Sequence, residues 1–206
     1  GERSMNTYLG VTEHLSPSDI DEAQMSNAGM IYLEGYRFDG PESHAAFAKA
    51  ITAAKGAGGK VSLTLSDPFC VERHRDAFRA MLRDHVDLLF ANRDEIMSMY
   101  QTQDYEAAMA EAAGEIAIVA CTEGDKGAHI LSGEARWDIP AWPVEIADAT
   151  GAGDAFAGAF LWAHARGNPL ERCGQMGCMA ASEVISHLGA RPEADLTELF
   201  RAEGLV

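Results

Sequence analysis

Short apolar runs alternate with longer helical patterns between residues 18 and 122, and this alternation constrains the fold more than any other feature. The runs are rich in β-branched and aliphatic residues, as strands are, and they lie at 30–35, 60–65, 86–91 and 115–122. Apolar residues recur at helical spacing in the neighbouring segments 18–28, 41–57, 71–85 and 104–113. Pro41 suits the first turn of the second of these segments. Strands that alternate with helices form parallel sheets through right-handed crossovers. The sequence therefore predicts an α/β fold with a doubly wound, mostly parallel sheet flanked by helices.

The remaining segments follow other patterns. Residues 1–10 alternate as a strand does, and the run 127–146 has no helical period and predicts short strands joined by turns. Further helical patterns occupy 152–166, 169–187 and 195–203. No linker or internal repeat interrupts the chain, so we expect a single domain over 1–206.

The charge balance excludes several classes of partner. Aspartate and glutamate outnumber lysine and arginine by 32 to 16, which gives a net charge of −16. Nucleic acids and anionic membranes attract clustered positive charge, so neither is an expected partner. A phosphate ligand would have to be bound by local backbone amides or through a metal ion.

The cysteine pattern and the hydropathy indicate a cytoplasmic protein. Cys70, Cys121, Cys173 and Cys178 form no CxxC pair, and nothing else indicates a disulfide framework. No apolar run is long enough to cross a bilayer, and no signal segment opens the chain.

The segment "DATGAGD", residues 148–154, has the composition of an anion site with a base beside it. Gly151, Ala152 and Gly153 precede an apolar helical pattern, where unpaired N–H groups and the helix dipole attract a phosphate. Asp154 on the same turn can accept a proton from an attacking hydroxyl group. The alternative is a purely structural role, in which Asp148 or Thr150 caps the helix and Asp154 complements the helix dipole. The segment matches neither a Walker A loop nor GxGxxG.

The longer stretch "DATGAGDAFAGAF" resembles the C-terminal signature D-T-x-G-A-G-D of the ribokinase-like (PfkB) carbohydrate and nucleoside kinases, with Ala149 as the one departure. The resemblance implies that Asp154 is the catalytic base. It also implies that the amides of Gly151, Ala152, Gly153 and Asp154 form the anion hole for the γ-phosphate of ATP. Asp148 and Thr150 match positions that help to hold a monovalent cation such as K⁺.

A second stretch, "FANRDE" (90–95), is similar to the N-x-x-E element of the same family. By this resemblance Asn92 binds at the ATP phosphates, and Glu95 holds Mg²⁺ through water. An amide and a carboxylate suit that cation. The alternative is that Asn92 caps a helix starting at Arg93, with Glu95 completing a capping box.

Two further stretches appear in the order that the family has. "CTEGDKGAHIL" (121–131) resembles its T-x-G-x-x-G segment, which implies that Thr122 and Gly124 line the ATP phosphate or ribose and that Gly127 serves the turn. Without the resemblance, this stretch reads as a β-hairpin turn.

"CMAASEVISHLGARP" (178–192) resembles the family's C-terminal helix. Ala181 would then flank the adenine, and the loop 184–189 would offer carbonyl groups to the monovalent cation. The alternative is an ordinary core helix with Gly189 as its C-cap.

The stretch 62–95 is similar to the adenosine kinase branch. This resemblance implies ATP- and Mg²⁺-dependent transfer of the γ-phosphoryl group to a hydroxymethyl group of a sugar or nucleoside. Kinases of fructose, ribose or ketodeoxygluconate are alternatives, and so is a nucleotide-binding module without catalysis. Asp67 ends a strand, where ligand groups collect, but it also fits an N-cap.

The family's N-terminal part, with its lid and most acceptor-binding side chains, has no counterpart in this sequence. We therefore expect the chain to be the C-terminal part of a longer kinase. Besides ATP and a sugar or nucleoside acceptor, the expected partners are a missing N-terminal segment or a second copy of the chain in a homodimer.

Overall fold

The computed structural model describes residues 8–206. The strand predicted over 1–10 lies largely outside these residues. Its described end has no strand, because Gly10 takes a left-handed φ of 58° and Gly10–His14 form a short 3₁₀ helix, η1.

Six strands form one mixed sheet in the sequential order β1 to β6, with helices beside it, so the α/β prediction is confirmed. β1 and β2 pair in parallel with Met30 opposite Lys60, and β2 and β3 pair in parallel with Leu63 opposite Leu89. The strands are β1 (Met30–Glu34), β2 (Lys60–Thr64), β3 (Leu88–Asn92), β4 (Ile118–Thr122), β5 (Ala128–Ser132) and β6 (Ala135–Ile139). The last two are the short strands expected within 127–146.

The helices follow the predicted pattern, with one addition. They are α1 (Glu22–Asn27), α2 (Ser43–Gly56), α3 (Pro68–Asp84), α4 (Arg93–Tyr100), α5 (Tyr105–Glu115), α6 (Ala152–His164), α7 (Leu170–Ile185) and α8 (Leu196–Ala202). Short 3₁₀ helices add η2 (Pro17–Asp19), η3 (Gly35–Asp39) and η4 (Gly124–Lys126). The addition is α4, which entered the sequence analysis only as the helix that Asn92 would cap.

Some boundaries differ for identifiable reasons. The strand predicted at 115–122 begins only at Ile118, because the amide of Ile116 still bonds to the helical carbonyl of Ala112. The strand predicted at 86–91 begins at Leu88, since the Asp87 carboxylate instead accepts the Val61 amide at 2.8 Å.

The chain divides into two compact units. The described residues of the N-terminal unit are 8–121 with 132–134, and those of the C-terminal unit are 122–131 and 135–206.

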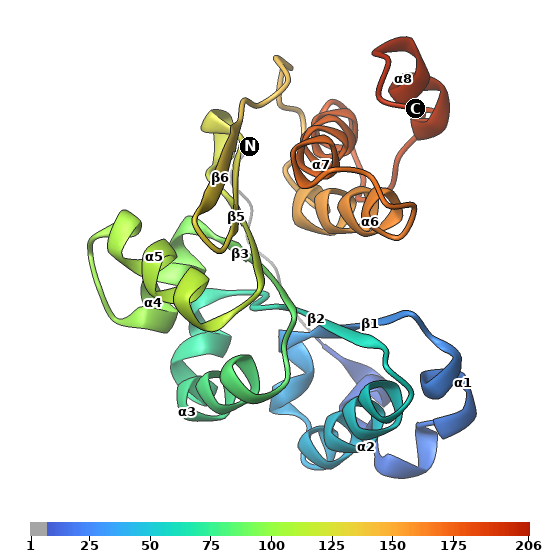
Figure 1. Cartoon of the computed structure of the whole chain (residues 1–206). Helices are drawn as coiled ribbons and strands as arrows, with labels where there is room; N and C mark the ends of the chain where they lie inside the picture. The colour runs from blue at the N-terminus through green and yellow to red at the C-terminus, as the bar shows by residue number, and fades with distance from the viewer. Residues whose placement is uncertain (1–7) are drawn as a thin grey trace. The chain divides into compact units, whose positions relative to one another are not determined.

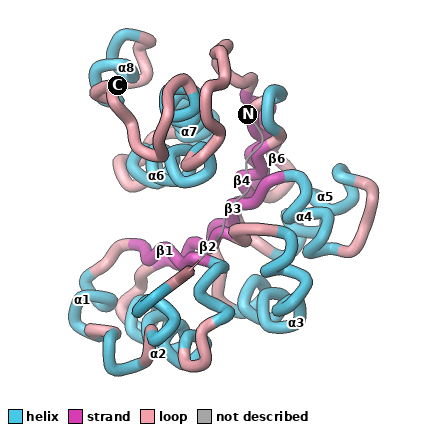
Figure 2. The backbone as a smooth tube through the Cα atoms, turned by 180° about the vertical axis from the view of Figure 1, so that it is seen from behind, coloured by secondary structure: helices cyan, strands magenta, loops and turns pink. Residues whose placement is uncertain are grey.

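The N-terminal unit is built on β1, β2 and β3. Figures 1 and 2 show α2 and α3 on the same side of β1 and β2. Right-handed crossovers between sequential parallel neighbours place their helices on one face. Fully buried side chains, among them Leu63, Leu88 and Phe78, form the core of this unit.

The C-terminal unit is built on the pair α6 and α7, which run side by side in Figure 1. Two glycines of α7 permit its close packing. A Cβ on Gly177 would lie 2.7 Å from the Phe156 ring of α6, and one on Gly174 would lie 2.8 Å from Ile139 of β6. The helix α7 therefore packs closely against α6 at Gly177 and against β5 and β6 at Gly174, where no larger side chain would fit.

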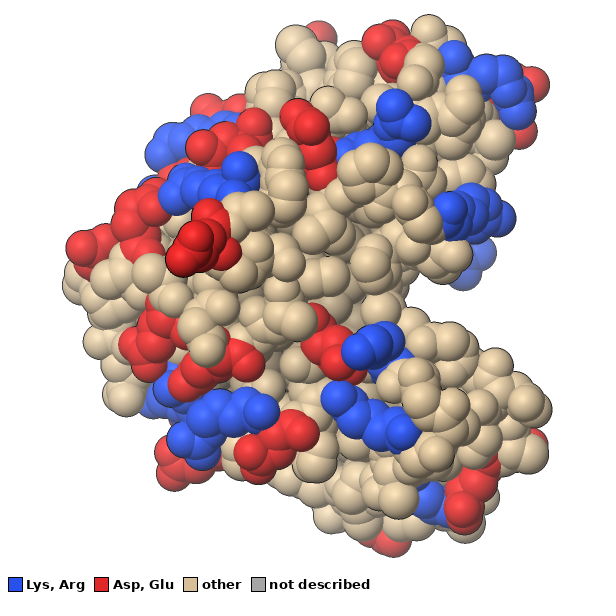
Figure 3. Space-filling model, viewed as in Figure 1, with Lys and Arg blue, Asp and Glu red and all other residues tan. Residues whose placement is uncertain are grey.

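The molecular surface carries both signs of charge. On the face in Figure 3, lysine and arginine side chains are interspersed with aspartate and glutamate. Within residues 8–206, no helix is both long and apolar enough to span a membrane. All four cysteines are buried, and none of them forms a disulfide within residues 8–206.

Candidate active site

The turn that opens α6 depends on Gly151. This residue is the N-cap and has a left-handed φ of 84°, and no side chain caps the helix. A Cβ at this position would lie 2.6 Å from the Ala190 carbonyl oxygen, so glycine is required both by conformation and by space. The first intrahelical bond runs from the Ala155 amide to the Gly151 carbonyl at 2.9 Å. The amides of the first turn thus point forward at the positive end of a helix dipole.

Asp148 holds this turn against the loop that follows α7. Its Oδ1 accepts the Thr150 amide at 3.0 Å and the Thr150 hydroxyl at 2.7 Å, while its Oδ2 accepts the Gly189 amide at 3.3 Å. The Ile185 carbonyl accepts the Ala147 amide at 2.9 Å. The structure therefore brings together the predicted cation-site residues Asp148 and Thr150 and the loop 184–189. The alternative that one of them caps α6 is wrong, because Gly151 occupies the N-cap.

Gly153 and Asp154 are exposed on the first turn of α6. A Cβ at Gly153 would meet no atom within 4 Å, and the residue has an ordinary helical φ. Packing within the described chain therefore does not require glycine here, although glycine in a helix costs about 1 kcal/mol relative to alanine. The open space lies over the same turn that carries the Asp154 carboxylate. This turn has room for a ligand close to its backbone.

Asn92 and Glu95 form a reciprocal capping box at the start of α4, as the alternative interpretation predicted. Asn92 Oδ1 accepts the Glu95 amide at 2.9 Å, and Glu95 Oε2 accepts the Asn92 amide at 2.8 Å. Asn92 Nδ2 donates to Glu95 Oε1 at 2.7 Å. Only 5% of Glu95 is exposed. Burial raises the pKa of Glu95 to about 7, and the nearby carboxylates of Asp67 and Asp94 push in the same direction.

This environment suits a bound cation. A positive ion beside Glu95 would oppose both the burial of its charge and the repulsion from Asp67 and Asp94. Within the described residues, no group of three or more His, Cys, Asp and Glu side chains could hold a metal by itself. Mg²⁺ normally keeps several waters and takes only one or two carboxylates together with substrate phosphates, so the residues present fit it.

The carboxyl ends of β1, β2 and β3 meet at one edge of the sheet, because these strands are parallel. Asp67 follows β2 and caps α3 by accepting the Cys70 amide at 2.8 Å, so its interpretation as an N-cap is confirmed. Burial raises the pKa of Tyr36, just after β1, to about 12, with Asp67 and Glu95 as neighbouring negative charges. Tyr36 and the exposed Phe69 had not been selected from the sequence. Tyr36 lies two residues after β1 and Phe69 in the first turn of α3, and these positions near strand ends are the signal that would have identified them.

The loop from Thr122 to Gly127 is a tight turn between β4 and β5. The Glu123 amide donates to the Gly127 carbonyl at 2.8 Å, and the Gly127 amide donates to the Gly124 carbonyl at 3.1 Å. Gly127 has a φ of 98°, and a Cβ there would lie 2.6 Å from the Ala141 amide nitrogen. The turn predicted for Gly127 is therefore present, and Thr122 at the end of β4 remains partly exposed.

The last predicted site residue, Ala181, lies partly exposed on α7. Its neighbour Ser182 donates its hydroxyl to the Trp142 carbonyl at 3.2 Å. The C-terminal unit thus carries Thr122, Gly124, Gly127, Asp148, Thr150, Gly151, Ala152, Gly153, Asp154 and Ala181. The N-terminal unit carries Asn92 and Glu95. The structure does not assign any of these residues to a ligand.

Comparison with known proteins identifies the family. The family model "pfkB family carbohydrate kinase" matches residues 1–196. This chain belongs to the pfkB family. The resemblance found in the sequence is thereby confirmed.

Individual pfkB relatives cover most of this chain. It is 31% identical over 205 residues to an ATP-dependent ribose-1-phosphate kinase of Halopiger xanaduensis, which covers 98% of this chain and 64% of that protein. It is 37% identical over 121 residues to a cytidine kinase of Thermococcus kodakarensis, which covers 57% of this chain and 43% of that protein.

Solved structures show the same fold. The adenosine kinase of Sinorhizobium meliloti superposes with a TM-score of 0.96 at 37% identity, covering 98% of this chain and 63% of that one. A probable sugar kinase of Rhizobium etli gives a TM-score of 0.92 at 40% identity, covering 94% and 59%. The chain thus spans between 43% and 64% of the length of these four proteins.

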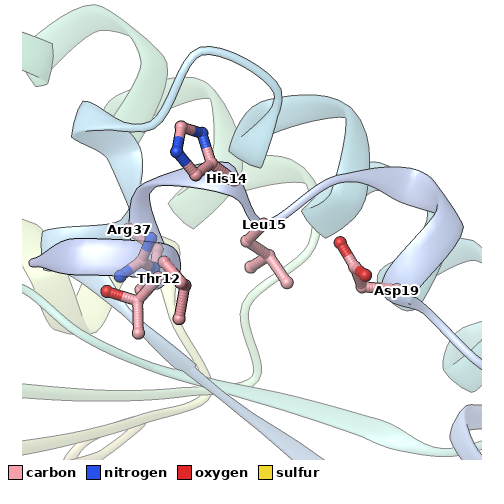
Figure 4. Close-up of a pocket in the computed structure, with 6 residues that line it drawn as sticks. Thr12, His14, Leu15, Asp19 and Arg37 are labelled. Atoms are coloured by element: carbon pink, nitrogen blue, oxygen red, sulfur yellow. The ribbon is translucent and has the colours of Figure 1, made fainter.

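The pfkB chain also has a hollow away from its signature residues. It has a volume of about 560 Å³ and lies within the N-terminal unit among η1, η2 and η3. Val11, Thr12, His14, Leu15, Asp19 and Arg37 line it. In Figure 4, Thr12 and Arg37 lie near each other and Asp19 lies at the far side. None of the predicted site residues contributes to this hollow.

Proposed function

We propose that this protein is a kinase that transfers the γ-phosphoryl group of ATP to a hydroxymethyl group of a nucleoside or sugar. The observation that carries the proposal is the first turn of α6. It combines a left-handed Gly151 backed by Ala190, open space over Gly153 and an exposed Asp154 carboxylate. An anion-binding helix terminus with a base on the same turn is the arrangement that phosphoryl transfer needs.

Asp154 is proposed to accept the proton of the acceptor hydroxyl group while the hydroxyl oxygen attacks the γ-phosphorus, the bond from the γ-phosphorus to the β–γ bridging oxygen breaks and ADP leaves. The amides of Gly151, Ala152, Gly153 and Asp154 then stabilise the negative charge on the equatorial oxygens of the transferring group. Because those amides are fixed by the helix, they need little reorganisation during the reaction. The hydrogen bonds that the Asp148 carboxylate accepts from the Thr150 and Gly189 amides keep the turn in place.

The cations are proposed on the same basis. Asn92 and Glu95 would hold Mg²⁺ through water, and the ion would neutralise charge on the phosphates of ATP. Asp148, Thr150 and the carbonyl groups of the loop 184–189 would hold a monovalent cation such as K⁺. Thr122, Gly124 and Gly127 would line the phosphate or ribose of ATP, and Ala181 its adenine.

A nucleoside is the acceptor that the exposed aromatic residues favour. Tyr36 and Phe69 follow β1 and β2 at the carboxyl edge of the sheet, with 37% and 71% of their surfaces exposed. Exposed rings at such an edge offer stacking surfaces to a planar base, which a simple sugar lacks. Two of the relatives described above are named as nucleoside kinases, one of cytidine and one of adenosine. Ribose, fructose and ketodeoxygluconate remain the alternative acceptors.

The decisive experiment compares the unmodified protein with Asp154→Asn. ATP consumption is measured with adenosine, cytidine, ribose and fructose, and ATP binding by calorimetry. Since the relatives are longer, both the 206-residue chain and the longest product of its gene are assayed. We expect at least a hundredfold loss of turnover in Asp154→Asn with ATP affinity preserved, as for loss of a general base.

Glu171→Gln is the matched control, because Glu171 is an exposed acid in the first turn of α7. It should keep full turnover. Equal turnover of Asp154→Asn and the unmodified protein would remove Asp154 from the role of base. ATP binding without transfer to any acceptor, by either protein product, would favour a nucleotide-binding module instead.

A further inference from the structure

A chain of charged side chains ties the Thr122–Gly127 loop to the strands β5 and β6. Glu123 lies in the loop, and its Oε2 is 3.0 Å from Nε2 of His129 on β5. The other ring nitrogen of His129 is 2.6 Å from Oδ1 of Asp138 on β6. Arg136 Nε donates to the same Asp138 oxygen at 2.7 Å, and Lys126 Nζ donates to Glu123 Oε1 at 2.6 Å.

The inner members of this network are shielded from solvent. The side chains of Glu123 and His129 are 10% and 13% exposed, whereas Asp138 and Lys126 are 63% exposed. Donors from His129 and Arg136 hold the pKa of Asp138 below its usual value, so this carboxylate is an acceptor at neutral pH. The Glu123–His129 hydrogen bond is the shielded contact of the network, and loss of one partner leaves the other polar group unsatisfied, which costs more than loss of an exposed contact.

The network acts on the backbone of the loop. Glu123 also donates its amide to the Gly127 carbonyl, and Lys126 donates its amide to the Glu123 carbonyl at 3.1 Å. The side chain of Glu123 therefore connects the closing hydrogen bonds of the turn to β5. Glu123 Oε2 faces the His129 ring and Glu123 Oε1 faces Lys126, so both carboxylate oxygens are engaged within the protein and act on the loop.

We propose that Glu123 and His129 are a positioning pair that holds the Thr122–Gly127 loop in the conformation that receives ATP. This inference rests on the proposed function, in which that loop lines the phosphate or ribose. Neither residue touches the reacting atoms. Loss of the pair should weaken ATP binding while the chemical step and the acceptor affinity stay nearly unchanged.

The test measures the Kd of ATP and, where turnover is present, KM and kcat for Glu123→Ala, His129→Ala and the double variant. Each single change should raise the Kd or KM of ATP about tenfold, as displacement of a positioning group does, with kcat within about twofold. The double variant should be no weaker than either single variant, because the two residues act as one unit. Glu123→Gln keeps an oxygen acceptor for His129 and should recover most of the affinity.

Glu134→Ala is the control, since Glu134 is an exposed acid in the turn between β5 and β6. Hydrogen exchange without nucleotide provides a readout independent of kinase activity. The amides of Glu123, Lys126 and Gly127 should exchange faster in His129→Ala than in the unmodified protein. Their exchange rates should be unchanged in Glu134→Ala. Unaltered exchange, or an unaltered ATP Kd in His129→Ala, would overturn the positioning role. If the unmodified protein binds no ATP while exchange still accelerates, the proposed function fails, and with it the nucleotide role of the pair.

Discussion

Replacement of Glu95 by glutamine should make the protein more stable at alkaline pH. Glu95 is 5% exposed, and its pKa rises from 4.5 in the unfolded chain to about 7 in the folded one. A proton is therefore bound more tightly in the folded state, and stability is lost as the pH rises from 4.5 to 7. At pH 8.5 the difference between the two pKa values of Glu95 lowers the free energy of unfolding by about 3 kcal/mol, because one pKa unit corresponds to about 1.4 kcal/mol.

Glutamine removes this cost and keeps the capping box. Glutamine has only one side-chain oxygen, so its NH₂ group would face one of the two donors that Asn92 directs at Glu95. The lost hydrogen bond should cost about 1 kcal/mol. The free energy of unfolding of Glu95→Gln should thus exceed that of the unmodified protein by about 2 kcal/mol at pH 8.5. At pH 5 the unmodified carboxyl is protonated, and the variant should be slightly less stable. The sign of the difference reverses between the two pH values.

Urea unfolding followed by far-ultraviolet circular dichroism measures this reversal, in buffers with EDTA so that no divalent cation intervenes. Glu72→Gln is the control, because it removes the carboxylate of an exposed acid on α3 and should show no reversal. The same stability difference at both pH values would mean that Glu95 ionises normally despite its burial.

Three further substitutions test the remaining geometry. A Cβ at Gly153 or Gly158 of α6 would meet no other atom, so Gly153→Ala and Gly158→Ala should each stabilise the protein by up to about 1 kcal/mol. Only Gly153→Ala should also lower the rate of ATP consumption, by at least about tenfold. Equal kinetics in the two variants would contradict a ligand over the first turn of α6. Gly151→Ala should lower the free energy of unfolding by about 2–4 kcal/mol, because the residue has a φ of 84° and the added Cβ would meet Ala190. Urea unfolding followed by tryptophan fluorescence measures this change, and a loss of less than about 1 kcal/mol would contradict the requirement for glycine. Asp87→Asn should cost about 1–3 kcal/mol at pH 7, because Asp87 accepts the Val61 amide and its lysine neighbours help to lower its pKa. That cost should shrink in urea titrations as the pH falls below about 4, where the carboxylate of the unfolded chain takes up a proton, and should vanish once the pH is below the lowered pKa of the folded carboxylate.

Local pattern was sufficient to predict most elements of the fold, because β-branched runs and helical periodicity are encoded by neighbouring residues. The exact ends were not predictable in the same way. Leu88 rather than Val86 begins β3 because Asp87 pairs with Val61, 26 residues away. Similarly, the requirement for Gly151 comes from Ala190, which no local pattern connects with it. Contacts between distant segments decide these details.

The candidate site shows a related division between function and stability. The sequence presented Asn92 and Glu95 either as a capping box or as a cation site, and the structure confirms only the first. The two roles are compatible, however, because the cap alone does not account for the acid in this position. Glutamine would also complete the box, without the cost of burying a charge beside Asp67 and Asp94. An ionised carboxylate is thus an expensive choice for a cap but a suitable one for a cation that arrives with ATP. The gain in stability expected for Glu95→Gln, together with a loss of Mg²⁺-dependent ATP use, would separate these two roles in a single variant.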